Sequence, residues 1–194
     1  MERRVNFFQG MDNSPDDYND LQDFAQASFD HVVGDAVTSS RRFAGFATAA
    51  TGALTIAAAI GRLYVGGKVY VRDSEFAHDF TAQLPQATRK VCVVVAFPEE
   101  VDTAERPREF LIDADSGETE PQTVSMERAR IARVNVVQGA EAPDPVPPVL
   151  DSNLTAIAYV TLGLTGIEKV EMVSANRLQS VHDVATRTDK LEAF

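Results

Sequence analysis

Residues 90–97, KVCVVVAF, place the tightest limit on the fold, because they form an almost unbroken apolar run rich in β-branched side chains. Such a run is typical of a β-strand that is covered on both faces. Pro98 follows at once and predicts the end of this strand. Cys92 is the only cysteine of the chain, so an internal disulfide is excluded, and its apolar surroundings predict a buried, unreactive thiol.

Short β segments separated by turn signals occupy much of the chain between residues 43 and 173. The proline-rich stretch "GAEAPDPVPPVLDSN" cannot be a central strand and predicts a surface loop, while "DADSGE" and "GLTG" predict turns. The spacing predicts six to eight strands in an antiparallel β-sandwich or barrel-like sheet. Besides 90–97, the expected strands are residues 53–59, 62–71, 109–113, 128–137, 154–162 and 167–173.

The segment "GRLYVGGKVYV", residues 61–71, comes close to a phosphate-binding loop. That motif needs Lys directly after the second Gly and then Ser or Thr. Here Gly67 takes the Lys position, Lys68 comes one place late and Val69 follows it. Gly66 and Gly67 instead suit a two-residue hairpin turn between β-forming residues. The expected cross-strand pairs are Val65 with Lys68, Tyr64 with Val69, and Leu63 with Tyr70.

An amphipathic helix of about five turns is predicted near the N-terminus, within "NSPDDYNDLQDFAQASFDHVVGDAVTSS". Ser14 suits the N-cap, Pro15 the first helical position, and the two aspartates that follow favour the positive end of the helix dipole. Ser39 and Ser40 predict its end. The apolar positions at three- and four-residue spacing are Tyr18, Leu21, Ala25, Phe29 (or Ser28), Val32 and Ala36.

The last nineteen residues return to helical spacing, so we expect an α+β, mainly β chain with a helix at each end. Val181, Val184, Thr188 and Leu191 follow a heptad pattern and predict the start of a coiled coil or packing on a neighbouring chain. The predicted organisation is an arm and helix in 1–42, a β-domain in 43–175 and a helix in 176–194.

Two acidic clusters invite a chemical interpretation. Glu99, Glu100 and Asp102 follow Pro98, and paired acids serve glycoside hydrolases, but an exposed acidic loop is the favoured interpretation. The turn around Gly117, with Asp113, Asp115 and Glu118, resembles a calcium loop that lacks its remaining ligands, so a solvated hairpin turn is favoured.

Histidines and nucleophiles form no known catalytic or metal-binding motif in the sequence. The three histidines, His31, His78 and His182, are far apart and lack metal-ligand spacing. No Gly-x-Ser-x-Gly motif is present. We therefore predict no catalytic, cofactor-binding or metal-binding residue and no enzymatic activity.

The net charge of −11 argues against nucleic acid or an anionic membrane surface as a partner. Residues 43–61 are uncharged, but they consist mostly of Ala, Thr and Gly, and their second half alternates like a strand. No membrane insertion is expected. The N-terminus, "MERRVNFFQGMDN", has no apolar segment after its basic start, so no signal peptide is expected.

The order of these segments resembles the proximal part of tail-fibre and baseplate proteins of tailed phages. The likeness rests on "RRVNFFQGMDNSPDDYNDLQDF" followed by a helix, on "LTIAAAIGRLYVGGKVYV", and on "LDSNLTAIAYVTLGLTGIEKVEMVSANRL", and it covers most of residues 3–178. It implies a virion structural protein, made in the host cytoplasm, that connects a fibre or spike to the baseplate. Partners would be other tail or baseplate proteins and copies of the chain itself, with a trimer favoured.

The expected contacts lie at the two ends of the chain. Apolar residues of the N-terminal arm would insert into a neighbouring subunit or fold back on their own domain. The candidate interaction residues are Phe7, Phe8, Met11, Tyr18, Leu21, Val181, Val184 and Leu191. Two alternatives stand beside this hypothesis: a glycan-binding receptor-recognition module using Tyr64 or Tyr159, and a hydrolase using Glu99 and Glu100.

Overall fold

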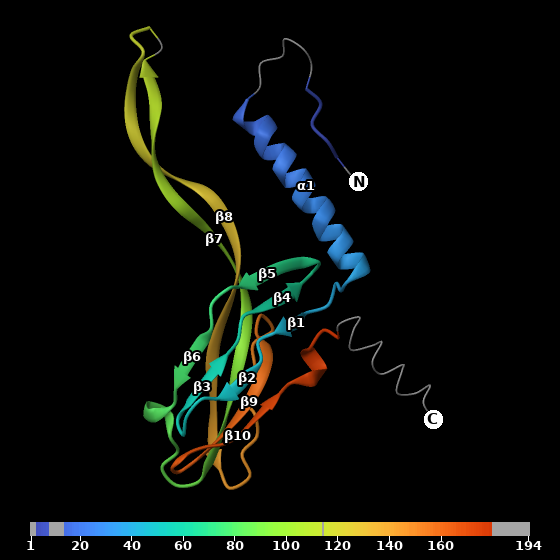
Figure 1. The fold of residues 1–194 in the computed structure, drawn as a ribbon, viewed down its shortest axis with the longest axis vertical. Helices are drawn as coiled ribbons and strands as arrows, with labels where there is room; N and C mark the ends of the chain where they lie inside the picture. The colour runs from blue at the N-terminus through green and yellow to red at the C-terminus, as the bar shows by residue number, and fades with distance from the viewer. Residues whose placement is uncertain (1–2, 8–13, 114, 180–194) are drawn as a thin grey trace.

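The computed structural model describes residues 3–7, 14–113 and 115–179 and combines one N-terminal helix with a mainly β domain (Figure 1). The helix and a long β-hairpin extend from the same end of this domain, at an angle to one another. The expected mainly β, α+β class is therefore confirmed. The C-terminal helix predicted for residues 176–194 lies largely outside the described residues, which end at Gln179.

A curled seven-stranded sheet forms the larger part of the β-domain. All neighbouring strands run antiparallel except β5 and β8, which meet in parallel at Val71 and Ile131, so the sheet is mixed where a purely antiparallel one was expected. Its order is β1 (Arg42–Gly45), β4 (Gly61–Val65), β5 (Lys68–Arg72), β8 (Glu118–Ala142), β7 (Arg89–Asp113), β9 (Thr155–Gly163) and β10 (Gly166–Met172).

A second, three-stranded sheet lies against the first. It consists of β2 (Thr48–Ala50), β3 (Thr55–Ala58) and β6 (Phe76–Asp79), with β3 in the centre. The short helices η1 (Thr81–Gln83) and η2 (Ser174–Asn176) follow β6 and β10. The edges of the large sheet approach one another, because the Leu178 N–H donates to the Phe43 carbonyl at 2.7 Å. The curled sheet is thus a half-barrel tied near its open side.

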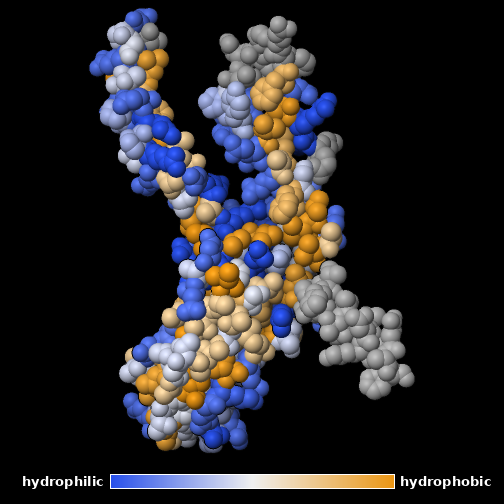
Figure 2. All heavy atoms as spheres, in the orientation of Figure 1, coloured by the Kyte–Doolittle hydropathy of each residue, from blue (hydrophilic) through white to orange (hydrophobic). Residues whose placement is uncertain are grey.

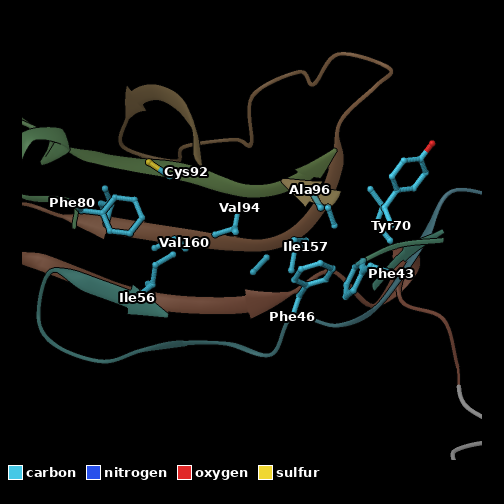
Figure 3. Close-up of a cluster of buried hydrophobic side chains, with 14 residues drawn as sticks. Phe43, Phe46, Ile56, Tyr70, Phe80, Cys92, Val94, Ala96, Ile157 and Val160 are labelled. Carbon is cyan, nitrogen blue, oxygen red and sulfur yellow. The ribbon is translucent and has the colours of Figure 1, made fainter. Parts of the chain in front are cut away.

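The hydrophobic core confirms that residues 90–97 form a strand covered on both faces. Cys92, Val94 and Ala96 point into a main cluster between the two sheets, together with Phe43, Phe46 and Ile157 (Figure 3). Val93 and Val95 point to the opposite face, where Leu150 and Leu154 from the proline-rich loop pack on them. The loop of residues 143–154 therefore covers the outer face of β7.

The Gly66–Gly67 hairpin has the register that the sequence predicts. Val65 pairs with Lys68, Tyr64 with Val69, and Leu63 with Tyr70. Both glycines have positive φ angles of 58° and 79°, as a primed turn requires. The hairpin of β9 and β10, linked through "GLTG", is likewise confirmed.

The prediction that Pro98 ends its strand is wrong. β7 runs through Pro98 to Asp113, and the segments expected as separate strands at 109–113 and 128–137 are parts of β7 and β8. The reason is that pairing of β7 with β9 stops at Ala96, while pairing with β8 continues. Beyond that point β7 is an edge strand, where proline is tolerated.

Candidate functional site

The helix α1 (Pro15–Ala36) exposes the apolar stripe that the sequence predicts, instead of packing it on the domain. Its start is the predicted one, since the Ser14 side chain and Asp17 form a reciprocal capping box. Val33 is the one buried residue of the helix. Four large apolar residues of the stripe are between 44% and 61% exposed, namely Tyr18, Leu21, Phe29 and Val32. Figure 2 shows hydrophobic atoms along the visible face of α1.

The N-terminal segment folds back on the first half of α1. The Phe7 ring stacks on the Tyr18 ring with centroids 5.9 Å apart, and the Arg3 guanidinium lies 5.8 Å from the Phe24 ring centroid. Phe7 nevertheless remains 44% exposed. The described part of the N-terminal segment therefore adds to the exposed apolar surface of α1 and does not cover that surface.

A charged network attaches the C-terminal half of α1 to the domain. Arg130 of β8 donates two hydrogen bonds to the Asp30 carboxylate, at 2.7 and 2.9 Å, and both side chains are more than 80% buried. Glu100 of β7 accepts from the Lys68 ammonium at 3.1 Å and from the Tyr70 hydroxyl at 3.4 Å. The network joins α1, β5, β7 and β8 at the base of the long hairpin.

The environment of this network shifts three pKa values. The hydrogen bond from the Lys68 ammonium is the main reason that the pKa of Glu100 lies below its usual value. The hydrogen bond with Asp30 raises the pKa of Arg130, and burial raises the pKa of Tyr70. Glu100 and Arg130 are thus held in their charged forms, while Tyr70 is held neutral, which suits a structural tether.

The long hairpin of β7 and β8 leaves the domain near residue 100, and we call residues 102–128 the arm. Its residues pair in an antiparallel register that shifts between Leu111 and Asp113, next to the turn. Exposed ion pairs support its faces, such as Arg128 with Asp102 at 3.0 Å and Arg106 with Glu127 at 3.5 Å. Twelve residues of β7 at about 3.3 Å each give the arm a reach of about 40 Å.

The turn at the end of the arm is held by hydrogen bonds to Asp113. The Asp113 carboxylate accepts from the Ser116 hydroxyl at 2.7 Å and from the Asp115 N–H at 2.8 Å. These hydrogen bonds lower the pKa of Asp113. Within the described part of the chain, no cluster of His, Cys, Asp and Glu side chains is arranged to hold a metal ion.

Three consecutive apolar residues lie next to this turn and are exposed to solvent. Phe110, Leu111 and Ile112 are 40%, 61% and 54% exposed. We call them the arm tip. Pro107 and Pro121 lie within the two strands nearby, and each removes one backbone N–H from an edge. The arm is therefore poorly suited to strand addition, which leaves its side chains as its contacting groups.

The net negative charge of the chain comes from these two projections. The helix α1 contains six aspartates and neither Lys nor Arg. The arm contains eight acidic residues and three arginines, so the two projections together carry −11, the net charge of the whole chain. The remaining residues are balanced in charge. Each projection thus combines exposed apolar side chains with an excess of carboxylates.

The paired acids after Pro98 do not form the expected exposed loop. Glu99 lies on β7 and pairs with Arg133, while Glu100 and Asp102 belong to the ion pairs given above. Three carboxylates that each face a cation are placed for cross-strand stabilisation. The prediction of a loop failed because Pro98 does not end β7.

The cysteine and the histidines considered in the sequence analysis lie in the following surroundings. Cys92 is fully buried, as predicted, and burial raises the pKa of its thiol. His78 lies on β6 between Phe76 and Phe80, with ring centroids 6.1 and 4.7 Å away. His31 lies on α1, far along the chain from His78, and His182 is outside the described residues.

Of the predicted interaction residues, Phe7, Tyr18 and Leu21 lie together on the outer surface of α1. Phe8, Met11, Val181, Val184 and Leu191 lie outside the described residues. The arm tip was missed. A signal for it was present, because "FLID" stands next to the turn "DADSGE" at the centre of two equally long, proline-containing segments.

Comparison with known proteins gives no match: no family model, no curated protein and no solved structure is similar to this chain. Among the described residues, no helix is both long and apolar enough to cross a membrane.

Proposed function

We propose that this protein is a structural component of a phage tail or baseplate, which connects a tail fibre or spike to the baseplate through protein–protein contacts. It would act in the virion without enzymatic activity, after synthesis in the host cytoplasm. Its partners would be copies of itself, with a trimer favoured, and other tail or baseplate proteins.

The observation that carries the proposal is the pair of projections with exposed apolar residues. A helix whose stripe contains Phe29 and Val32 at about 60% exposure gains little from folding alone. Large apolar surface outside the core is typical of protein–protein contact sites. The fully buried β-domain core beneath would serve as the rigid base for both projections.

Measuring the native mass of the full chain over a range of concentrations tests this proposal. We expect an oligomer that dissociates when Phe29→Asp introduces a carboxylate into the stripe. Ala27→Asp adds the same charge at another exposed position of α1 and is the matched control. A monomer at every concentration, unchanged by Phe29→Asp, would count against the proposal.

The alternative of a glycan-binding module receives less support. Tyr64 and Tyr159, the aromatic residues considered for stacking on a sugar, are only partly exposed within β4 and β9. Binding on a glycan array that is lost in Tyr64→Ala or Tyr159→Ala would restore this alternative.

A further inference from the structure

A hollow in the β-domain combines apolar residues with arginines, whereas carboxylates outnumber cations in both projections. It measures about 380 Å³ and lies between β1, β4 and the end of β5. Ile60 and Val71 contribute apolar surface and are 60% and 40% exposed. Its main lining residues are Ala44, Ile60, Arg62, Val71, Arg72 and Asp73.

At Arg72, one of the two arginines of this hollow, a hydrogen-bond donor is left without a partner among the described residues. Arg72 donates to the Glu75 carbonyl at 3.3 Å and lies over the Phe76 ring, 5.6 Å from its centroid. Its Nε atom is buried and has no hydrogen-bond partner among the described residues. Arg62 is exposed at the rim, and Asp73 is the one acidic residue of the lining. The hollow therefore suits an apolar group that carries carboxylates.

The arm tip has this complementary chemistry. Phe110, Leu111 and Ile112 supply three exposed apolar side chains, and Glu109 and Glu120 flank them on the paired strands. The arm of the same molecule cannot supply them, because the paired ribbon extends away from the β-domain (Figure 1). A second copy of the chain carries the same tip at the end of a reach of about 40 Å.

We propose that the arm tip of one copy docks in the hollow of a second copy, with Glu109 facing Arg62. This contact rests on the proposed assembly function and deepens it by naming the two surfaces. Tip and hollow are different surfaces, so the contact is head-to-tail and generates a closed ring or a growing filament. Three side chains bury less than the roughly 1,000 Å² of a stable interface, so the flanks of the arm must contribute as well.

Cross-linking between separate variants tests which surfaces meet. The full-length variants Ile60→Cys and Leu111→Cys are mixed and oxidised, with Cys92 buried and unreactive. We expect a mixed disulfide dimer in large excess over either homodimer. Leu164→Cys replaces a leucine of similar exposure, 55%, in the turn between β9 and β10, and is the matched control for Leu111→Cys. Equal cross-linking of Ile60→Cys to both leucine sites would overturn the proposal.

A charge-reversal cycle tests the pairing itself. Arg62→Glu and Glu109→Arg should each raise the concentration needed for assembly about tenfold, whereas the double variant should recover most of the loss. If the double variant shows the summed loss of assembly of the two single variants, the proposed contact between tip and hollow is wrong. If the wild type assembles and responds to Phe29→Asp but not to these reversals, the proposed function stands and this inference fails. If the wild type never assembles, both fail.

Discussion

The β-domain and its two projections use the same kinds of residues in opposite ways. In the β-domain, Phe43, Leu63 and Ile157 are fully buried and the charges nearly cancel. In α1 and the arm, the large apolar residues face solvent and the carboxylates predominate. Folding stability explains the first arrangement but not the second. This contrast between buried and exposed apolar residues is the main support for the proposal that the projections contact other molecules.

The two regions also differ in how they are held. The inner strands of the β-domain are paired on both sides and the core side chains are buried, whereas α1 is tied mainly near its C-terminal half by Asp30 and Val33. Most of the stability of a helix in a protein comes from packing its apolar face, and α1 leaves most of that face exposed. We therefore expect stability to be concentrated in the β-domain and to decrease along both projections.

The largest effect is expected from the core. Ile157→Ala should lower the free energy of unfolding by about 2–5 kcal/mol, because it leaves a cavity in a fully buried site. Phe29→Ala and Phe110→Ala should change it by no more than about 0.5 kcal/mol, since both side chains are exposed. Urea unfolding followed by circular dichroism measures all three. Equal losses would remove the distinction between the regions.

The second largest loss of stability is expected from breaking the ion pair of Asp30 and Arg130, which attaches α1 to the β-domain. Arg130→Met leaves the Asp30 carboxylate largely buried without its partner, which should cost about 1.5–3 kcal/mol. The loss should be seen as faster hydrogen exchange in residues 15–36, while β9 stays protected. Arg128→Met removes a 70% exposed arginine from the same strand and should change exchange little. Identical profiles for the two variants would exclude a special role for Arg130.

A smaller difference in the free energy of unfolding is expected between two alanine variants of the Gly66–Gly67 turn, because a side chain at Gly67 would meet α1 and one at Gly66 would not. A Cβ atom at Gly67 would lie 2.7 Å from the Asp30 carbonyl oxygen, whereas one at Gly66 would meet no atom within 4 Å. Both positions have positive φ, so each change to Ala costs about 1–2 kcal/mol of backbone strain. Gly67→Ala should cost about 1 kcal/mol more than Gly66→Ala. Thermal unfolding compares them, and equal melting temperatures would contradict this contact.

The smallest effect is a pH dependence at Glu100. Its pKa is lowered in the folded state, so its contribution is complete above the unfolded value of about 4.3 and is lost as pH falls through the lower folded value. Since the side chain is 36% exposed, the contribution should stay below about 1 kcal/mol. The stability difference between wild type and Glu100→Gln should therefore shrink between pH 5 and pH 3. A difference that grows on acidification would reverse this assignment.

Local chemistry made much of the fold predictable. The Ser14 cap, the Gly66–Gly67 turn with its register, and the two-sided burial of residues 90–97 each depend on neighbouring residues in the sequence. Pro98 was misinterpreted because its effect depends on whether a third strand pairs beside it, which is a property of the whole sheet.

The candidate site was less predictable for the same reason. The apolar spacing of α1 is the same whether its stripe packs on the domain or faces solvent, so its exposure could not be derived from periodicity. The pairing of Asp30 with Arg130 joins residues one hundred positions apart. The proposed contact between the tip and the hollow likewise joins different elements, so no local sequence pattern could indicate it.

The hydrogen bond from Leu178 to Phe43 also has a consequence for the timing of synthesis. The β-domain cannot complete its edge until residue 178 has been translated, and its central β7 waits for β9. The helix and its apolar stripe leave the ribosome well before that point. For most of translation the nascent chain therefore displays α1 without a folded base beneath it, and folding through such distant contacts is slow.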